Sequence, residues 1–221
     1  MSDLVSSHDL WLVIDAATRD HVSGKKAERG IPEVLKDMAA GLSAAHIDYA
    51  LVGALARGMY GRPRATRDID LVAMRSAKTK LMAAFDAMGL MLVQDSPYRL
   101  TYKDHKSEVE IDTLLGELDP ERSAVADSQS ASIFGVPVPL IKPEYLLWMY
   151  VLSDRPQHWP DGIDLVNAGR VDLDLLRRDL RRADDAIAER RLTEIIQRAA
   201  KERASTYSDS VMKRLGINRE A

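Results

Sequence analysis

The chain has 221 residues and no cysteine, and its 31 lysines and arginines against 34 aspartates and glutamates give a formal net charge of −3. This length suffices for a sizeable core in one domain or two small ones. The charge excludes a strongly basic coat for nucleic acid, and the lack of cysteine excludes disulfides, thiolate catalysis and zinc–sulfur sites. Residues 1–20 contain only the short apolar run 10–14 and lack the basic start of a signal peptide, so we expect a cytoplasmic protein with no membrane contact.

The N-terminal half is predicted to combine helices and strands. After a polar start through Arg29, Ile31 and Pro32 open a helix whose apolar residues recur at helical spacing. These residues are Val34, Leu35, Met38 and Leu42. A strand over 47–53, a short helical segment, a basic loop and a second strand from Asp68 follow.

Further strands are predicted to extend the same sheet. Ser76 is predicted to cap a helix that ends at Gly89. Strands are then expected near 91–94 and 98–103, followed by an acidic strand from Glu108. These elements predict an α/β (α+β) fold with a mixed sheet flanked by helices.

The remainder of the chain is predicted to become helical. A polar, partly helical stretch over 116–132 leads to residues 133–141, whose two prolines fit an edge strand. Pro143 is placed to open a helix over 144–153 that is apolar almost all round and therefore buried. Further helices are predicted from Asp161, from Asp172 and from Asp184 to about Arg203.

The chain is thus predicted to divide into three parts. These are an N-terminal extension over 1–30, an α/β domain over 31–142 and a helical C-terminal domain over 143–221.

The strongest chemical signal is the pair Asp68 and Asp70 at the start of the second predicted strand. Because side chains alternate along a strand, both acids share one face while Ile69 and Leu71 point into the protein. Neighbouring carboxylates repel each other, so a cation is expected between them. Rigidly held oxygen ligands suit Mg²⁺, which commonly takes one or two protein carboxylates together with substrate phosphates.

The residues around this pair resemble a known family. The motifs are Leu51-Val-Gly-Ala-Leu-Ala and Gly61-Arg-Pro-Arg-Ala-Thr-Arg-Asp-Ile-Asp-Leu-Val. They resemble the polymerase-beta-like nucleotidyltransferase superfamily, in particular its small bacterial members of the abortive-infection and toxin–antitoxin type. The resemblance covers about residues 47–176. It implies a nucleotidyltransferase-like fold, two Mg²⁺ ions, and transfer of a nucleoside monophosphate from a nucleoside triphosphate to a hydroxyl acceptor.

The resemblance also implies a third carboxylate on a neighbouring strand. In the acidic strand, alternation puts Glu108, Glu110 and Asp112 on one face and apolar residues on the other. Asp112 lies deepest in the apolar run, as the family's acid does, and Glu110 is the alternative. The predicted catalytic and metal-binding residues are therefore Asp68, Asp70 and Asp112.

The predicted nucleotide site is the glycine turn and the basic loop that follows it. Backbone N–H groups at Gly53 and Ala54, at the start of a helix, suit an anion. Arg57, Arg64 and Arg67 are expected to add charge, because guanidinium groups bind phosphate oxygens in bidentate fashion. The alternatives are that these arginines are merely solvated, or that Arg67 forms a structural salt bridge.

Three departures from the family pattern leave two functions open. Ala54 replaces a small polar residue, Tyr150 stands where a lysine is often found, and His158 stands where the family turn has an acid. The first hypothesis is an active nucleotidyltransferase whose acceptor is RNA, protein or a small molecule. The second is a nucleotidyltransferase-fold binding protein with weakened catalysis that acts as a toxin–antitoxin component with a cognate partner protein.

Overall fold

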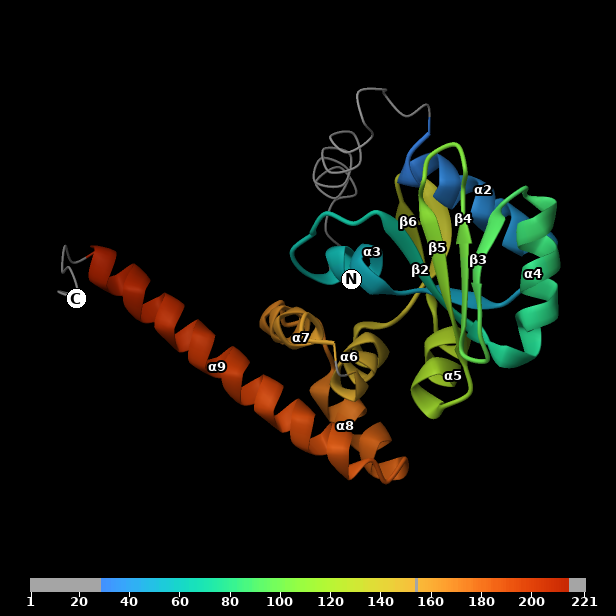
Figure 1. Ribbon diagram of the computed structural model, residues 1–221. Coiled ribbons are helices and arrows are strands. Elements are labelled where there is room, and N and C mark those ends of the chain that lie inside the picture. The colour runs from blue at the N-terminus through green and yellow to red at the C-terminus, as the bar shows by residue number, and fades with distance from the viewer. Residues whose placement is uncertain (1–28, 154, 215–221) are drawn as a thin grey trace. The chain divides into compact units, whose positions relative to one another are not determined.

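Residues 29–153 and 155–214 are described here by a computed structural model (Figure 1). They form two compact units, which divide between Leu146 and Leu147. Nearly all of the predicted N-terminal extension over 1–30 lies outside the described residues. The predicted domain boundaries stay predictions.

The first unit is built on a seven-stranded mixed sheet in the order β3-β4-β5-β2-β1-β7-β6. β2 pairs with β5 and β1 pairs with β7 in parallel, and the other neighbours are antiparallel. The strands are β1 (Tyr49–Leu51), β2 (Asp68–Met74), β3 (Met91–Asp95), β4 (Arg99–Lys103), β5 (Glu110–Gly116), β6 (Gln129–Ile133) and β7 (Val136–Leu140). This architecture confirms the predicted mixed α/β fold.

Helices cover both faces of this sheet (Figure 1). They are α2 (Ile31–Ala44), α3 (Gly53–Tyr60), α4 (Lys78–Ala87) and α5 (Asp119–Ala126). The Phe85 ring of α4 packs on Tyr102 of β4, with 4.9 Å between ring centroids. α3 and α5 contact β2 from the other face, where Gly53 and Gly116 allow close approach. The sheet is therefore the middle layer of three.

The predicted helix after Pro32 is confirmed as α2. The five residues that this helix buries are Ile31, Val34, Leu35, Met38 and Leu42. Their spacing gives the helix one apolar stripe, which is the reason that the helix could be predicted from the sequence.

The predicted Ser76 cap is wrong. A short 3₁₀ turn, η1 (Arg75–Ala77), precedes α4, and Ala77 occupies the N-cap position without a side-chain hydrogen bond. Ser76 lies inside this turn, so its hydroxyl is not placed to accept from the first turn of α4. The predicted end of the helix is correct, because Gly89 takes the left-handed conformation, with φ +72°, that closes a helix.

The predicted edge strand is also wrong, because β7 lies inside the sheet between β1 and β6. Phe134 and Gly135, both with positive φ, form a two-residue hairpin turn from β6 into β7. This register puts Pro137 and Pro139 at positions that do not hydrogen-bond to β6. Their missing N–H groups face β1, which pairs with β7 only at Leu51 and Leu140 among the described residues.

The second unit is helical. After α6 (Pro143–Leu152), which crosses the boundary between the units, it contains α7 (His158–Asn167), α8 (Leu173–Arg182) and α9 (Ala186–Arg214). The predicted helix starts lie within a few residues of the observed ones. Asp172 caps α8, and α7 begins three residues before Asp161. The last helix, α9, continues beyond the predicted end at Arg203. In the described part of the chain, no helix is both long enough and apolar enough to cross a membrane.

Removing a buried side chain from β2 should cost more than removing the same side chain from the exposed sheet edge. Leu71 of β2 is 1% exposed, whereas Leu92 of β3 is 42% exposed. We expect Leu71→Ala to lower the free energy of unfolding by about 2–5 kcal/mol. Leu92→Ala should lower it by about 1 kcal/mol or less. Urea unfolding of both variants measures the difference, and equal losses would contradict the core described here.

Candidate active site

Asp68 and Asp70 lie on the same face of β2, as strand alternation predicts. Ile69 is fully buried on the opposite face, and Leu71 is nearly so. Both acids are partly exposed. Thr66 donates its hydroxyl hydrogen to Oδ1 of Asp68, which fixes the first carboxylate at the start of the strand.

The pairing of β2 with β5 brings the third acid beside this pair. Asp112 stands directly opposite Asp70, and Glu110 stands opposite Asp68. Adjacent strands lie about 4.8 Å apart, so the carboxylates of Asp70 and Asp112 share a small region of the sheet surface. Asp112 is buried, with 9% of its surface exposed, and Glu110 is exposed. The register therefore places the three predicted acids on the same face of two adjacent strands, with Glu110 next to Asp68.

Glu108 does not belong to the acidic strand, so the predicted three-acid face is wrong at this position. Glu108 has a φ of +62° and lies in the turn before β5, which begins at Glu110. Its carboxylate forms an ion pair with Lys103 and raises the pKa of that lysine. The left-handed backbone at Glu108 breaks the alternation on which the prediction depended.

The neighbouring Asp70 leaves no room for a side chain at Gly53. The residue has a φ of +64°, and a Cβ added there would lie 1.9 Å from Oδ2 of Asp70. The Val52 N–H also donates to the Asp70 carbonyl oxygen at 2.9 Å. The glycine turn at the start of α3 is thus packed directly against the second carboxylate, with Ala54 next along the helix.

The three predicted arginines differ in their surroundings. Arg57 is only 5% exposed, and its Nη1 donates to the Arg62 carbonyl oxygen at 2.8 Å, which holds the basic loop against α3. Arg64 and Arg67 are exposed on that loop. Arg57 therefore has a structural contact, whereas Arg64 and Arg67 are accessible to a ligand.

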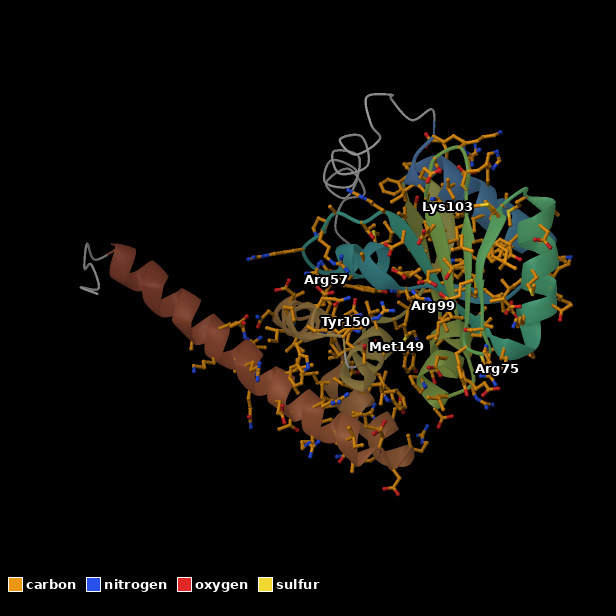
Figure 2. The ribbon with its side chains drawn as sticks, viewed as in Figure 1. Arg57, Arg75, Arg99, Lys103, Met149 and Tyr150 are labelled. Carbon is orange, nitrogen blue, oxygen red and sulfur yellow. The ribbon has the colours of Figure 1, made fainter. Side chains whose placement is uncertain are left out.

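The sequence interpretation missed the residues that hold Asp112. The Nε and Nη2 atoms of Arg99 contact Oδ1 and Oδ2 of Asp112, and the Thr101 hydroxyl donates to Oδ1 at 3.1 Å. Arg99 and Thr101 lie on β4. Figure 2 shows Arg99 between Lys103, near one end of the sheet, and Arg75, near the other.

The sequence contains one part of the information that identifies Arg99 and Thr101, namely the alternation along their strand. Alternation over 99–103 separates Arg99, Thr101 and Lys103 from the buried Leu100 and Tyr102. The sequence does not give the register in which Thr101 pairs with Asp112, and only that register identifies the partner of Arg99.

Two residues that depart from the family pattern contact each other in the C-terminal unit. The rings of Tyr150 in α6 and His158 in α7 have centroids 4.7 Å apart and are tilted by 34°. Tyr150 is buried. Both aromatic rings thus contribute to the packing of α6 on α7.

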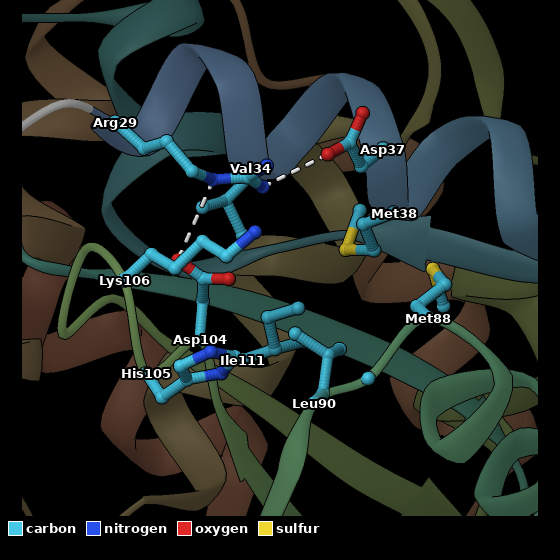
Figure 3. A pocket seen from close by; sticks show the side chains of 11 residues that line it. Arg29, Val34, Asp37, Met38, Met88, Leu90, Asp104, His105, Lys106 and Ile111 are labelled. Atoms are coloured by element: carbon cyan, nitrogen blue, oxygen red, sulfur yellow. Dashed lines mark ion pairs between the residues drawn. The ribbon is translucent and has the colours of Figure 1, made fainter.

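A pocket of about 190 Å³ lies on the face of the sheet opposite the acids (Figure 3). Ile111 of β5 and Met38 of α2 line it. At its rim, Arg29 is 2.9 Å from the carboxylate of Asp37 and 3.5 Å from that of Asp104. These ion pairs tie the start of α2 to the β4–β5 turn, and the pocket is separate from the acid cluster.

The fold has counterparts among solved structures. No protein-family model matches the sequence, and no curated protein matches it. An antigenic nucleotidyltransferase-like protein from Paracoccidioides brasiliensis is 17% identical, with a TM-score of 0.53, over 80% of this chain and 92% of that chain. The enzyme ANT(2″)-Ia, in complex with adenylyl-2″-tobramycin, is 17% identical, with a TM-score of 0.50, over 68% of this chain and 96% of that chain.

These similarities show a nucleotidyltransferase-like fold, as the sequence motifs predict. At this level of identity they concern the fold alone. The toxin–antitoxin and abortive-infection type stays a prediction.

Gly53→Ala should lower the free energy of unfolding more than an alanine substitution at another glycine with positive φ. Gly89 also has a positive φ, but a Cβ there meets nothing within 4 Å. Gly89→Ala should therefore lose only the backbone preference, about 1–2 kcal/mol. Gly53→Ala adds the clash with Asp70 and should lower the free energy of unfolding by clearly more than Gly89→Ala. Equal losses in thermal and urea unfolding would mean that the carboxylate does not pack on the turn.

Proposed function

We propose that this protein is a Mg²⁺-dependent nucleotidyltransferase that transfers a nucleoside monophosphate from a nucleoside triphosphate to a hydroxyl acceptor. The observation that carries the proposal is the register that sets Asp112 opposite Asp70, which shares a strand face with Asp68 and packs against the glycine turn. The nucleotidyltransferase-like fold supports it. The acceptor is RNA, protein or a small molecule, and we propose a cytoplasmic location.

The donor set suits a hard divalent cation, because all three acids offer carboxylate oxygens. Asp68 and Asp70 are partly exposed on one strand face and would hold both ions. Asp112 would hold the catalytic ion once its oxygens are released from Arg99. Among the described residues, no group of three acidic or histidine side chains is arranged as a metal site, and Asp112 is paired with Arg99. Bound Mg²⁺ would neutralise charge on the phosphates and align the reacting groups.

The triphosphate would lie at the start of α3. The backbone N–H groups of Gly53 and Ala54 belong to the first turn of this helix, where N–H groups lack helical partners and the dipole favours an anion. Arg64 and Arg67 are exposed cations of the adjoining loop and would bind phosphate oxygens. Arg57 would act by holding that loop in place.

The protein needs no nucleophile of its own for this reaction. The acceptor hydroxyl would form the new O–P bond while the bond to pyrophosphate breaks, and Asp112 would accept the hydroxyl proton. Positioning and charge neutralisation would supply most of the rate enhancement.

A second function is favoured by one observation, the arginine on Asp112. A guanidinium group that permanently replaces a metal ion would leave a nucleotidyltransferase-fold protein with weakened catalysis. Such a protein would act as a binding or toxin–antitoxin component with a cognate partner protein. Ala54, Tyr150 and His158 add to this possibility, because they depart from the family pattern.

Removing one acid charge should abolish transfer while sparing the fold. Asp70→Asn and Asp112→Asn should lower transfer from labelled triphosphates to cell extracts by orders of magnitude. The melting temperature in metal-free buffer should hold or rise for Asp70→Asn, because repulsion between carboxylates is reduced. Glu110→Gln serves as the control and should be mild. Full activity in Asp70→Asn would contradict the enzyme proposal, and severe loss in Glu110→Gln with a silent Asp112→Asn would identify Glu110 as the third acid.

The exposed loop arginines should contribute to phosphate affinity. Arg64→Ala should weaken triphosphate binding about tenfold or more, because a charge-assisted contact contributes about 1.5–3 kcal/mol. Arg122→Ala changes an exposed arginine of α5 and should leave binding unchanged. Isothermal titration with a triphosphate and Mg²⁺ measures both. Unchanged binding with a lower melting temperature for Arg64→Ala would show that the loop is structural.

A further inference from the structure

The contact between Arg99 and Asp112 uses the whole carboxylate. Nε of Arg99 contacts Oδ1, and Nη2 contacts Oδ2, so both oxygens of Asp112 face one guanidinium group. Thr101 adds a third donor to Oδ1. A bidentate pair of this kind combines charge attraction with a fixed geometry.

The two partners differ in their freedom to move. The Asp112 side chain is 11% exposed and is anchored on the interior strand β5, with Thr101 opposite it. The Arg99 side chain is 37% exposed and reaches Asp112 diagonally, because Arg99 itself pairs with Leu114. The Arg99 side chain can therefore move to solvent, whereas Asp112 cannot leave its place.

The charges explain why an arginine is present. Asp70 stands opposite Asp112. The Asp70 carboxylate also packs against Gly53. Without a counterion, the buried Asp112 would face both desolvation and the repulsion of its neighbour. The guanidinium group of Arg99 removes both penalties.

We propose that Arg99 is a positioning residue that occupies the metal-binding place of Asp112 in the metal-free protein and must withdraw before a divalent cation binds there. The inference rests on the proposed metal site. Arg99 holds the carboxylate of Asp112 in a fixed orientation, and in doing so it lowers the affinity of the free protein for the cation. Arginine and metal thus compete for the same two oxygens.

Mn²⁺ binding without nucleotide tests this competition directly. Wild type, Arg99→Gln and the control Arg75→Gln are titrated with Mn²⁺, and free Mn²⁺ is followed by electron paramagnetic resonance. Arg75 is a matched control, since it is 31% exposed and pairs with Glu117 at the end of the same sheet. We expect Arg99→Gln to bind Mn²⁺ about tenfold more tightly than wild type, because the cation no longer displaces a charge-assisted pair. Arg75→Gln should bind Mn²⁺ like wild type.

Melting temperatures with and without Mn²⁺ give a second readout. In metal-free buffer, Arg99→Gln should melt at a lower temperature than wild type, and saturating Mn²⁺ should raise its melting temperature by more. In the double variant Arg99→Gln/Asp112→Asn, the metal-free melting temperature should recover, because no buried charge is left without a partner. The gain in Mn²⁺ affinity should also disappear. A merely structural role for Arg99 also predicts this recovery, but it does not predict tighter Mn²⁺ binding.

The outcomes separate this inference from the proposed function. Mn²⁺ binding that is weakened by Asp70→Asn but equal in wild type and Arg99→Gln would overturn the role of Arg99 and leave the metal site standing. Absence of Mn²⁺ binding in wild type and Arg99→Gln, with and without triphosphate, would overturn both.

Discussion

The parallel pairing of β2 with β5 is the constraint on which the candidate site depends. Its register sets Asp70 beside Asp112 and Asp68 beside Glu110, so four carboxylates gather on two adjacent strands. Such a cluster is unfavourable unless cations or hydrogen-bond donors compensate it. Core residues hold the two strands in this register. Ile69 and Ile111 alternate with the acids along β2 and β5, and both are fully buried on the opposite face of the sheet.

Each of the three aspartates has its own neighbour in the folded chain. Thr66 donates to Asp68, the glycine turn packs against Asp70, and Arg99 holds Asp112. These neighbours come from a loop, a helix start and a third strand, so the site is assembled from segments far apart in sequence. This arrangement orients three carboxylates on one face of the sheet, which is what the proposed metal site requires.

Local patterns predicted the parts of this structure that depend on short-range chemistry. The stripe of α2, the alternation at Asp68 and Asp70, and the glycine end of α4 follow from spacing and backbone preference alone. Features that depend on pairing between distant segments could not be predicted. The place of β7 inside the sheet and the contact between Arg99 and Asp112 both require a register that one sequence does not contain.

The single bridge between β1 and β7 divides the sheet into two unequal ladders. β6 and β7 form a hairpin whose prolines leave few hydrogen bonds to β1, and Tyr60 helps to fasten it by donating to the Ile141 carbonyl oxygen while accepting from Gln129. This hairpin can open by local unfolding without disturbing the continuous ladder from β3 to β1. Amide hydrogens of β6 and β7 should therefore exchange with solvent sooner than those of β2 and β5, which carry the acids.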